Sequence, residues 1–237
     1  MRPGLSLVIA AAALAVPGVA LLAAPARKPA AHAPAARDWT RTVLATPEGG
    51  FRKGNPAAPL KLVEYGSLTC PHCAAFSRDA TATLNGYVKS GRVSWEFRPY
   101  LLFPTDPGLS LLARCKGAAS FFPITDQLYA EQESWLDRLR QLPGDELQRM
   151  QALPPRERIA AMVKAAQLDA FFIQHGLPAA RVNQCLGDAQ ALKALLEVTR
   201  HAQTIDVTGT PTFFINGKKA ENVHDWASLE PLLRPPG

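Results

Sequence analysis

Two cysteines three positions apart, in the stretch Cys70-Pro71-His72-Cys73, carry the most evident chemistry of this sequence. They follow an apolar run over residues 60–68 that predicts a β-strand, and they open a helical pattern that extends to about Lys89. A helix N-terminus presents unpaired N–H groups and the positive end of the helix dipole, so it stabilises a thiolate of Cys70 and lowers its pKa. A dithiol with such a thiolate favours its reduced form, and its disulfide therefore oxidises other thiols.

The residues around the two cysteines fit a redox centre better than a metal site. Pro71 suits the first helical position, and His72 can donate a hydrogen bond or hold positive charge beside the sulfur. The alternatives are half of a zinc site or a pair of inert structural thiols. A structural zinc site needs four ligands, whereas Cys115 and Cys185 are isolated and no H-x₃₋₅-H motif occurs. We therefore expect no metal.

Residues 1–26 predict a signal peptide, because an apolar run after Arg2 ends in the small residues Ala24-Pro25-Ala26. An uncleaved signal-anchor is the alternative, because the run approaches the length of a membrane span. Residues 27–37 are rich in Ala and Pro and predict a linker. Four of the 26 basic residues precede the first acidic residue, leaving 22 bases against 20 acids, with no basic stripe that would favour nucleic-acid binding.

The other two cysteines predict a structural disulfide. An exported chain with four cysteines can pair Cys115 with Cys185 once Cys70 and Cys73 form their own pair. Two buried free thiols are the alternative.

The order of predicted elements indicates an α/β protein with a helical insertion. A strand over residues 41–45, the strand before Cys70, the helix after it and a strand from Val93 come first, and strand–helix–strand order implies a parallel pair. Helical spacing then dominates, and strand chemistry returns in a hairpin over residues 212–219, with a last helix over 226–233. The helices are expected over 110–120, 124–142, 155–175, 178–186 and 189–204, separated by breakers such as Pro123.

Residues 62–76 and 209–217, with the helical stretch between them, resemble the DsbA-like thiol:disulfide oxidoreductases of bacterial envelopes. The resemblance implies a thioredoxin-like sheet domain, residues 38–106 plus 204–237, interrupted by a helical insertion over 107–203. It implies that Cys70 is the exposed nucleophile and Cys73 its more buried partner. It also implies that Pro211 is a cis proline packed against the active-site disulfide, with the backbone of Thr210 free to pair with a client strand.

Two residues qualify this interpretation. Glu64 lies six positions before Cys70 on an otherwise apolar strand, where a buried carboxyl with a raised pKa can relay a proton to or from Cys73. The alternative is an ordinary half-exposed strand acid. Thr210 stands where many oxidases of this family carry Val, and Thr is also found there in isomerases and reductases.

The sequence therefore predicts an exported, periplasmic thiol:disulfide oxidoreductase without metal or organic cofactor, and a monomer. The resemblance implies folding exported proteins as clients and a DsbB-like membrane quinone reductase as the reoxidant. A disulfide isomerase or reductase of the same fold is the alternative enzyme. A metal- or peptide-binding module that reuses the fold is the alternative from another class.

Overall fold

The computed structural model describes residues 37–234, so the predicted signal peptide and nearly all of the predicted linker lie outside the described residues. After a short 3₁₀ turn, Trp39–Arg41, the described chain contains six strands and ten helices. The strands are β1 Val43–Ala45, β2 Phe51–Gly54, β3 Leu60–Gly66, β4 Val93–Pro99, β5 Thr212–Ile215 and β6 Lys218–Lys219. The helices are α1 Pro71–Lys89, α2 Asp106–Cys115, α3 Ala118–Ala130, α4 Gln132–Arg140, α5 Gly144–Gln151, α6 Pro155–Ala165, α7 Leu168–Gln174, α8 Ala179–Leu186, α9 Ala189–Thr204 and α10 Trp226–Leu233.

The six strands form one mixed sheet in the order β1-β2-β4-β3-β5-β6. β3 and β4 are parallel, with Leu62 opposite Trp95 and Glu64 opposite Phe97, and α1 connects them. The other neighbouring strands are antiparallel. The predicted parallel pair is confirmed. The protein also has the predicted α/β fold class, a thioredoxin-like sheet with helices inserted between β4 and β5.

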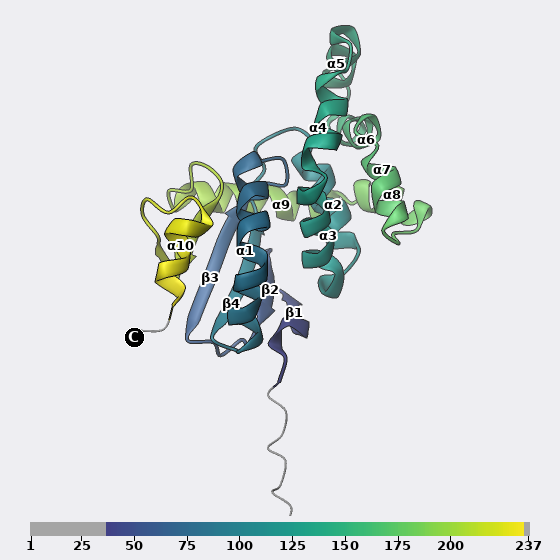
Figure 1. Cartoon of the computed structure of the whole chain (residues 1–237). Helices are drawn as coiled ribbons and strands as arrows, with labels where there is room; N and C mark the ends of the chain where they lie inside the picture. Colours follow the sequence, from purple (N-terminus) through teal and green to yellow (C-terminus); the bar gives the residue numbers. More distant parts are fainter. Residues whose placement is uncertain (1–36, 235–237) are drawn as a thin grey trace, which may run out of the picture. The chain divides into compact units, whose positions relative to one another are not determined.

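Successive side chains of β3 point to opposite faces of the sheet, as a period of two requires. Leu62 packs in the core that contains Phe76 and Leu84 of α1, and Glu64 shares its face. Tyr65 packs instead with Val198 of α9. Figure 1 shows α1 in front of β4, with α9 passing behind the sheet. Glu64 is thereby directed to the layer between the sheet and α1, the helix that carries the dithiol.

The C-terminal hairpin follows its prediction. Asn216 and Gly217 have φ angles of 51° and 80°, the left-handed pair that a two-residue turn needs, and β5 pairs with β6 across them. Phe213 packs against Phe76 of α1, and Phe214 contacts Tyr65 on the opposite face. The hairpin thus places β5, which begins directly after Pro211, beside β3.

Several boundaries differ from the sequence prediction. The strand β2 was not expected, and β1 begins two residues later than predicted. The break expected at Pro123 lies instead at Gly117, where φ is +87°, and Pro123 is inside α3. Burial of Phe121 and Phe122 in one core cluster against Phe51, Trp95 and Phe97 of the sheet outweighs the one hydrogen bond that a proline removes.

The helical stretch is also divided more finely than periodicity indicated. Residues 155–175 form two helices, α6 and α7, because Gln167 adopts a left-handed conformation with φ of 57°. The helix α5 was not predicted. The helices α4 to α8 lie together, away from the sheet (Figure 1). Among the helices of residues 37–234, none has the combination of length and apolarity needed to cross a bilayer.

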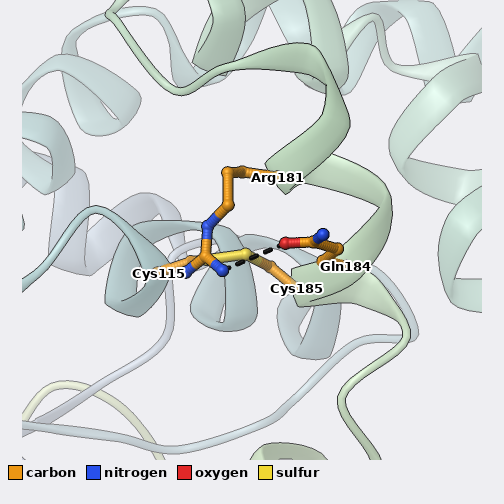
Figure 2. The surroundings of a disulfide bond; sticks show 4 residues. All are labelled: Cys115, Arg181, Gln184 and Cys185. Carbon is orange, nitrogen blue, oxygen red and sulfur yellow. Dashed lines mark hydrogen bonds between the residues drawn. A yellow bond between two sulfur atoms is a disulfide. The ribbon is translucent and has the colours of Figure 1, made fainter.

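Cys115 and Cys185 form a disulfide, with 6.1 Å between their Cα atoms. It joins the last residue of α2 to α8, and Arg181 of α8 lies against the sulfur of Cys115 while donating to Gln184 (Figure 2). The predicted pairing is confirmed, and the alternative of two free thiols is not.

Candidate active site

Cys70 and Cys73 lie at the start of α1, as the sequence predicted. Cys70 is the residue before the first helical turn, with φ of −80° and ψ of 122°, and Pro71 occupies the first helical position. Pro71 is tolerated there because the first N–H groups of a helix have no intrahelical acceptor. In this structure both cysteines are thiols.

The sulfur of Cys70 is held against the loop that precedes β5. It donates to the carbonyl oxygen of Thr210 at 3.3 Å, and the Thr210–Pro211 peptide bond is cis. Cys70 is only 5% exposed, so it is less open than the expected exposed nucleophile, because the Thr210–Pro211 loop covers it. It is nevertheless the more accessible thiol, since Cys73 is fully buried.

The two thiols have opposite pKa shifts. The pKa of Cys70 is lowered from 9.0 to about 5, chiefly by a hydrogen bond from the Cys73 side chain. Burial opposes this, while contact with Thr210 and the backbone N–H groups of Cys73 and His72 lower the pKa further. Burial raises the pKa of Cys73 well above its usual value, and the hydrogen bond to Cys70 and the charge of Glu64 add to that effect. Cys70 is thus the thiolate at neutral pH, and Cys73 keeps its proton.

Glu64 is 1% exposed, which excludes the alternative of a half-exposed strand acid. Its Oε2 accepts a hydrogen bond from Nε1 of Trp95 at 3.0 Å. Burial raises its pKa to about 8; the Trp95 hydrogen bond opposes that rise, and the charges of Asp126 and Cys70 add to it. A carboxyl group that is mostly protonated near neutral pH can both give and take a proton.

A buried lysine, which the sequence analysis did not single out, lies on the same side of the sheet. Lys53 of β2 is 6% exposed, donates to Asn85 at 2.7 Å, and lies over the ring of Trp95, 4.8 Å from its centre. Burial lowers the pKa of Lys53 to about 8, and the charge of Asp126 partly opposes this. Because Trp95 contacts both Lys53 and Glu64, a charged base and a neutral acid share one buried region. The sequence could have indicated a buried Lys53 only if β2 had been recognised as a strand.

A second buried acid, Asp106, contacts the turn that leads into Cys70. It is 1% exposed, and its oxygens accept hydrogen bonds from Ser67 and Thr69. The same turn is contacted by Tyr129 of α3 and Gln132 of α4. The sequence offered no pattern for these three residues, because they lie 36 to 62 positions beyond Cys70 and meet it only in the folded chain.

Two grooves flank the dithiol. One, of about 370 Å³, has a mixed polar and apolar lining and is bounded by the exposed His72, the loop of residues 208–212 and residues 219–224. The other, of about 360 Å³, begins at Thr69 and Pro71 and is lined mainly by apolar side chains. These are Phe103 of the loop before α2 and Leu136, Leu139, Leu147 and Met162 of the helices α4 to α6. A polypeptide crossing Cys70 would therefore meet a mixed surface on one side and a mainly apolar surface on the other.

His72 is placed beside the dithiol, and the role expected for its imidazole stays a prediction. Its backbone N–H lowers the pKa of Cys70, whereas its imidazole is exposed and makes no hydrogen bond within residues 37–234. In the same part of the chain, no group of three or more His, Cys, Asp or Glu side chains is arranged to hold a metal ion.

A parallel β3–α1–β4 unit, a dithiol at the start of its helix and a cis proline opposite the reactive sulfur define a thioredoxin-fold protein with a candidate redox centre. The family described as Thioredoxin matches residues 46–234, and the chain belongs to that family.

Similar proteins agree with this assignment. A protein assigned as a protein-disulfide oxidoreductase in Rickettsia prowazekii is 27% identical over 174 residues, which is 71% of this chain but 55% of that relative. The chain therefore spans about half the length of the curated relatives it matches. A structure of a protein-disulfide isomerase from Novosphingobium aromaticivorans is 31% identical with a TM-score of 0.74, over 77% of this chain and 94% of that one. The alpha-DsbA1 structure of Wolbachia pipientis, at 20% identity and a TM-score of 0.63 over 80% of this chain and 91% of that one, shares the fold.

Proposed function

We propose that this chain is an exported thiol:disulfide oxidoreductase that introduces disulfides into envelope or secreted proteins. The observation that carries the proposal is the pair of opposite pKa shifts at the start of α1, beside Thr210 and Pro211. A Cys70 thiolate that persists at pH values above about 5 stabilises the reduced dithiol and leaves readily in the second exchange step, so transfer of the Cys70–Cys73 disulfide to a client is favoured.

The exchange proceeds in two steps. A client thiolate attacks the sulfur of Cys70; the Cys70–Cys73 bond breaks, and Cys73 leaves and takes up a proton. A second client thiolate then attacks the client sulfur of the mixed disulfide, and Cys70 leaves as a thiolate. The client loses two electrons and the enzyme gains them.

Glu64 and the Thr210–Pro211 loop have supporting roles in this proposal. Glu64 holds a proton that can pass to the Cys73 sulfur as that sulfur leaves, which its buried position and pKa near 8 favour. The backbone of Thr210 pairs with an extended client segment, and Pro211 keeps that backbone beside Cys70. His72 contributes its backbone N–H group rather than its imidazole.

The cellular setting is part of the proposal. Export through the predicted signal peptide would place the enzyme in the periplasm, as a monomer acting on folding proteins. A DsbB-like membrane quinone reductase would reoxidise it. The resemblance of the sequence to DsbA-like oxidoreductases, rather than the structure, supports these partners.

Trapping tests the exchange directly. In Cys73→Ser, the mixed disulfide on Cys70 cannot be resolved internally, so we expect covalent adducts with exported proteins on non-reducing gels. The matched variant Cys70→Ser should accumulate none. Absence of adducts from Cys73→Ser in cells that express it in folded form would contradict the proposal.

A disulfide isomerase or reductase is the second candidate, and Thr210 before the cis proline favours it. The reduction potential separates the two. A value near −120 mV, on the scale of strong oxidants, supports the oxidase, whereas one near −270 mV, on the scale of thioredoxin, supports the reductase.

A further inference from the structure

The carboxylate of Asp106 is buried in the first turn of α2 without a positively charged partner in the described chain. Its oxygens accept hydrogen bonds from the backbone N–H groups of Thr69 at 3.2 Å, Leu102 at 2.8 Å and Phe103 at 3.0 Å. The hydroxyl of Thr69 lies 3.0 Å away and that of Ser67 lies 2.8 Å away. Burial raises the pKa of Asp106, and the hydrogen bonds from Phe103, Ser67, Leu102 and Thr69 oppose that rise because they stabilise the ionised acid.

Two further side chains of the helical segment hold the same turn. The hydroxyl of Tyr129 donates to the carbonyl of Ser67 at 3.1 Å. The amide of Gln132 donates to the carbonyls of Leu68 at 2.9 Å and Cys70 at 3.1 Å. Three helices, α2, α3 and α4, therefore each supply one buried side chain to the four residues that end at Cys70.

This turn fixes the geometry of the reactive sulfur. The N–H of Cys70 donates to the carbonyl of Ser67 at 3.2 Å, and the carbonyl of Cys70 accepts the first hydrogen bond of α1, from Ala74 at 3.1 Å. The position of the Cys70 sulfur, 3.3 Å from the carbonyl of Thr210, follows from the backbone angles of Cys70. A shift of a few tenths of an ångström in the turn would move this sulfur relative to the Cys73 thiol and the backbone N–H groups of His72 and Cys73, which are the donors that stabilise the thiolate.

We propose that Asp106, Tyr129 and Gln132 are positioning residues for Cys70, through which the helical segment sets the reactivity of a dithiol that belongs to the sheet domain. The inference deepens the proposed exchange activity and rests on it for its biological meaning. The geometry it describes is measurable without any client or reoxidant.

The sign of a pKa change tests this role. Titration of the Cys70 thiolate in the reduced protein, followed by absorbance near 240 nm, reports the pKa directly. If Asp106 acted on Cys70 only by its negative charge, Asp106→Asn would lower that pKa, because a nearby anion disfavours a thiolate. If Asp106 positions the turn, Asp106→Asn raises the pKa, by roughly one unit, because the contacts to the thiolate are lost.

Two neutral substitutions test the same proposal independently of Asp106→Asn. Tyr129→Phe and Gln132→Leu each remove hydrogen bonds to the turn without a change of charge, and both should raise the pKa of Cys70. If Asp106→Asn does not fold, these variants carry the test. The control is Thr125→Ala, which removes a buried hydroxyl of α3 that donates to Phe122 and does not contact the turn.

The Cys70 pKa values of these variants distinguish a positioning role from its absence. A raised Cys70 pKa in the positioning variants and an unchanged one in Thr125→Ala support the proposal. An unchanged or lowered pKa in folded Asp106→Asn, Tyr129→Phe and Gln132→Leu overturns it, as does an equal rise in Thr125→Ala. Failure of Cys73→Ser to trap clients would contradict the proposed function while leaving the titration result intact.

Discussion

At the scale of single residues, the site combines groups whose charge states are set by burial and by the hydrogen bond between the two cysteines. Cys70 and Cys73 are neighbours in one helical turn, yet the pKa of the first is lowered to about 5 and that of the second is raised. The cause is mutual: the Cys73 thiol donates to the Cys70 sulfur, so a thiolate at Cys70 keeps a proton on Cys73. Glu64 reinforces this division, because its charge would further disfavour a thiolate at Cys73.

Glu64→Gln should stabilise the protein most at high pH. The pKa of Glu64 is about 8 in the folded chain and about 4.5 when unfolded, so the folded state holds an extra proton and loses stability as pH rises from 4.5 to 8. Gln has no such loss, and its amide oxygen can still accept from Trp95. Between pH 5 and pH 8.5, the free energy of unfolding of the variant should rise relative to that of the wild-type protein by at most about 3 to 5 kcal/mol, measured by denaturant unfolding.

Thr125→Ala, a neutral change that removes a hydroxyl bonded to Phe122, is the comparison for this experiment, because it should leave the pH dependence of unfolding as it is. An identical pH profile in Glu64→Gln and the wild-type protein would show that Glu64 does not titrate in this range.

At the scale of elements, α2 links the dithiol to the rest of the helical segment. Its first residue, Asp106, contacts the turn before Cys70, and its last residue, Cys115, is bridged to α8. The arginine against the bridge, Arg181, comes from α8 as well. A single ten-residue helix therefore connects the active-site turn to a covalent anchor.

Removal of the bridge should destabilise the fold. The disulfide closes a loop with a sequence separation of 70 residues. The chain-entropy model gives about 4 kcal/mol of stabilisation for such a loop. We expect Cys115→Ala/Cys185→Ala to lose 2 to about 4 kcal/mol in the free energy of unfolding, measured with the active site reduced. An unchanged free energy would mean that the helices are held by packing alone.

At the scale of the whole molecule, the redox state of the dithiol is coupled to folding stability. The pKa of Cys70 is lowered from 9.0 to about 5 on folding, so the Cys70 thiolate stabilises the folded reduced protein at pH values above about 5. The gain is complete above pH 9, decreases as pH falls, and disappears below about pH 5.

Reduced protein should accordingly unfold at a higher denaturant concentration than oxidised protein at pH 7. The expected contribution of the thiolate is no more than about 3 kcal/mol. The same comparison at pH 4.5 should show a much smaller difference, because the thiolate is protonated there. A difference that does not depend on pH would contradict the assigned thiolate.

Sequence patterns were enough to predict the local features: the C-x-x-C at the start of a helix, the parallel strand–helix–strand unit, the Asn216-Gly217 hairpin and the acid at position 64. Each depends on the periodicity or conformational preference of residues close together in the chain, which a sequence displays directly. The pairing of Cys115 with Cys185 followed from cysteine number and expected compartment, and the structure confirmed it.

The remaining residues of the site are brought to Cys70 by the folding of distant segments. Lys53 comes from a strand too short and polar to be recognised, and Asp106, Tyr129 and Gln132 come from helices far along the chain. Their importance lies in burial and in hydrogen bonds to the backbone of the turn that ends at Cys70. Those contacts depend on three-dimensional packing of distant segments, which no local pattern encodes. For the same reason, the sequence placed a reactive thiolate at Cys70, and only the fold showed that the Cys73 thiol is its main stabilising contact.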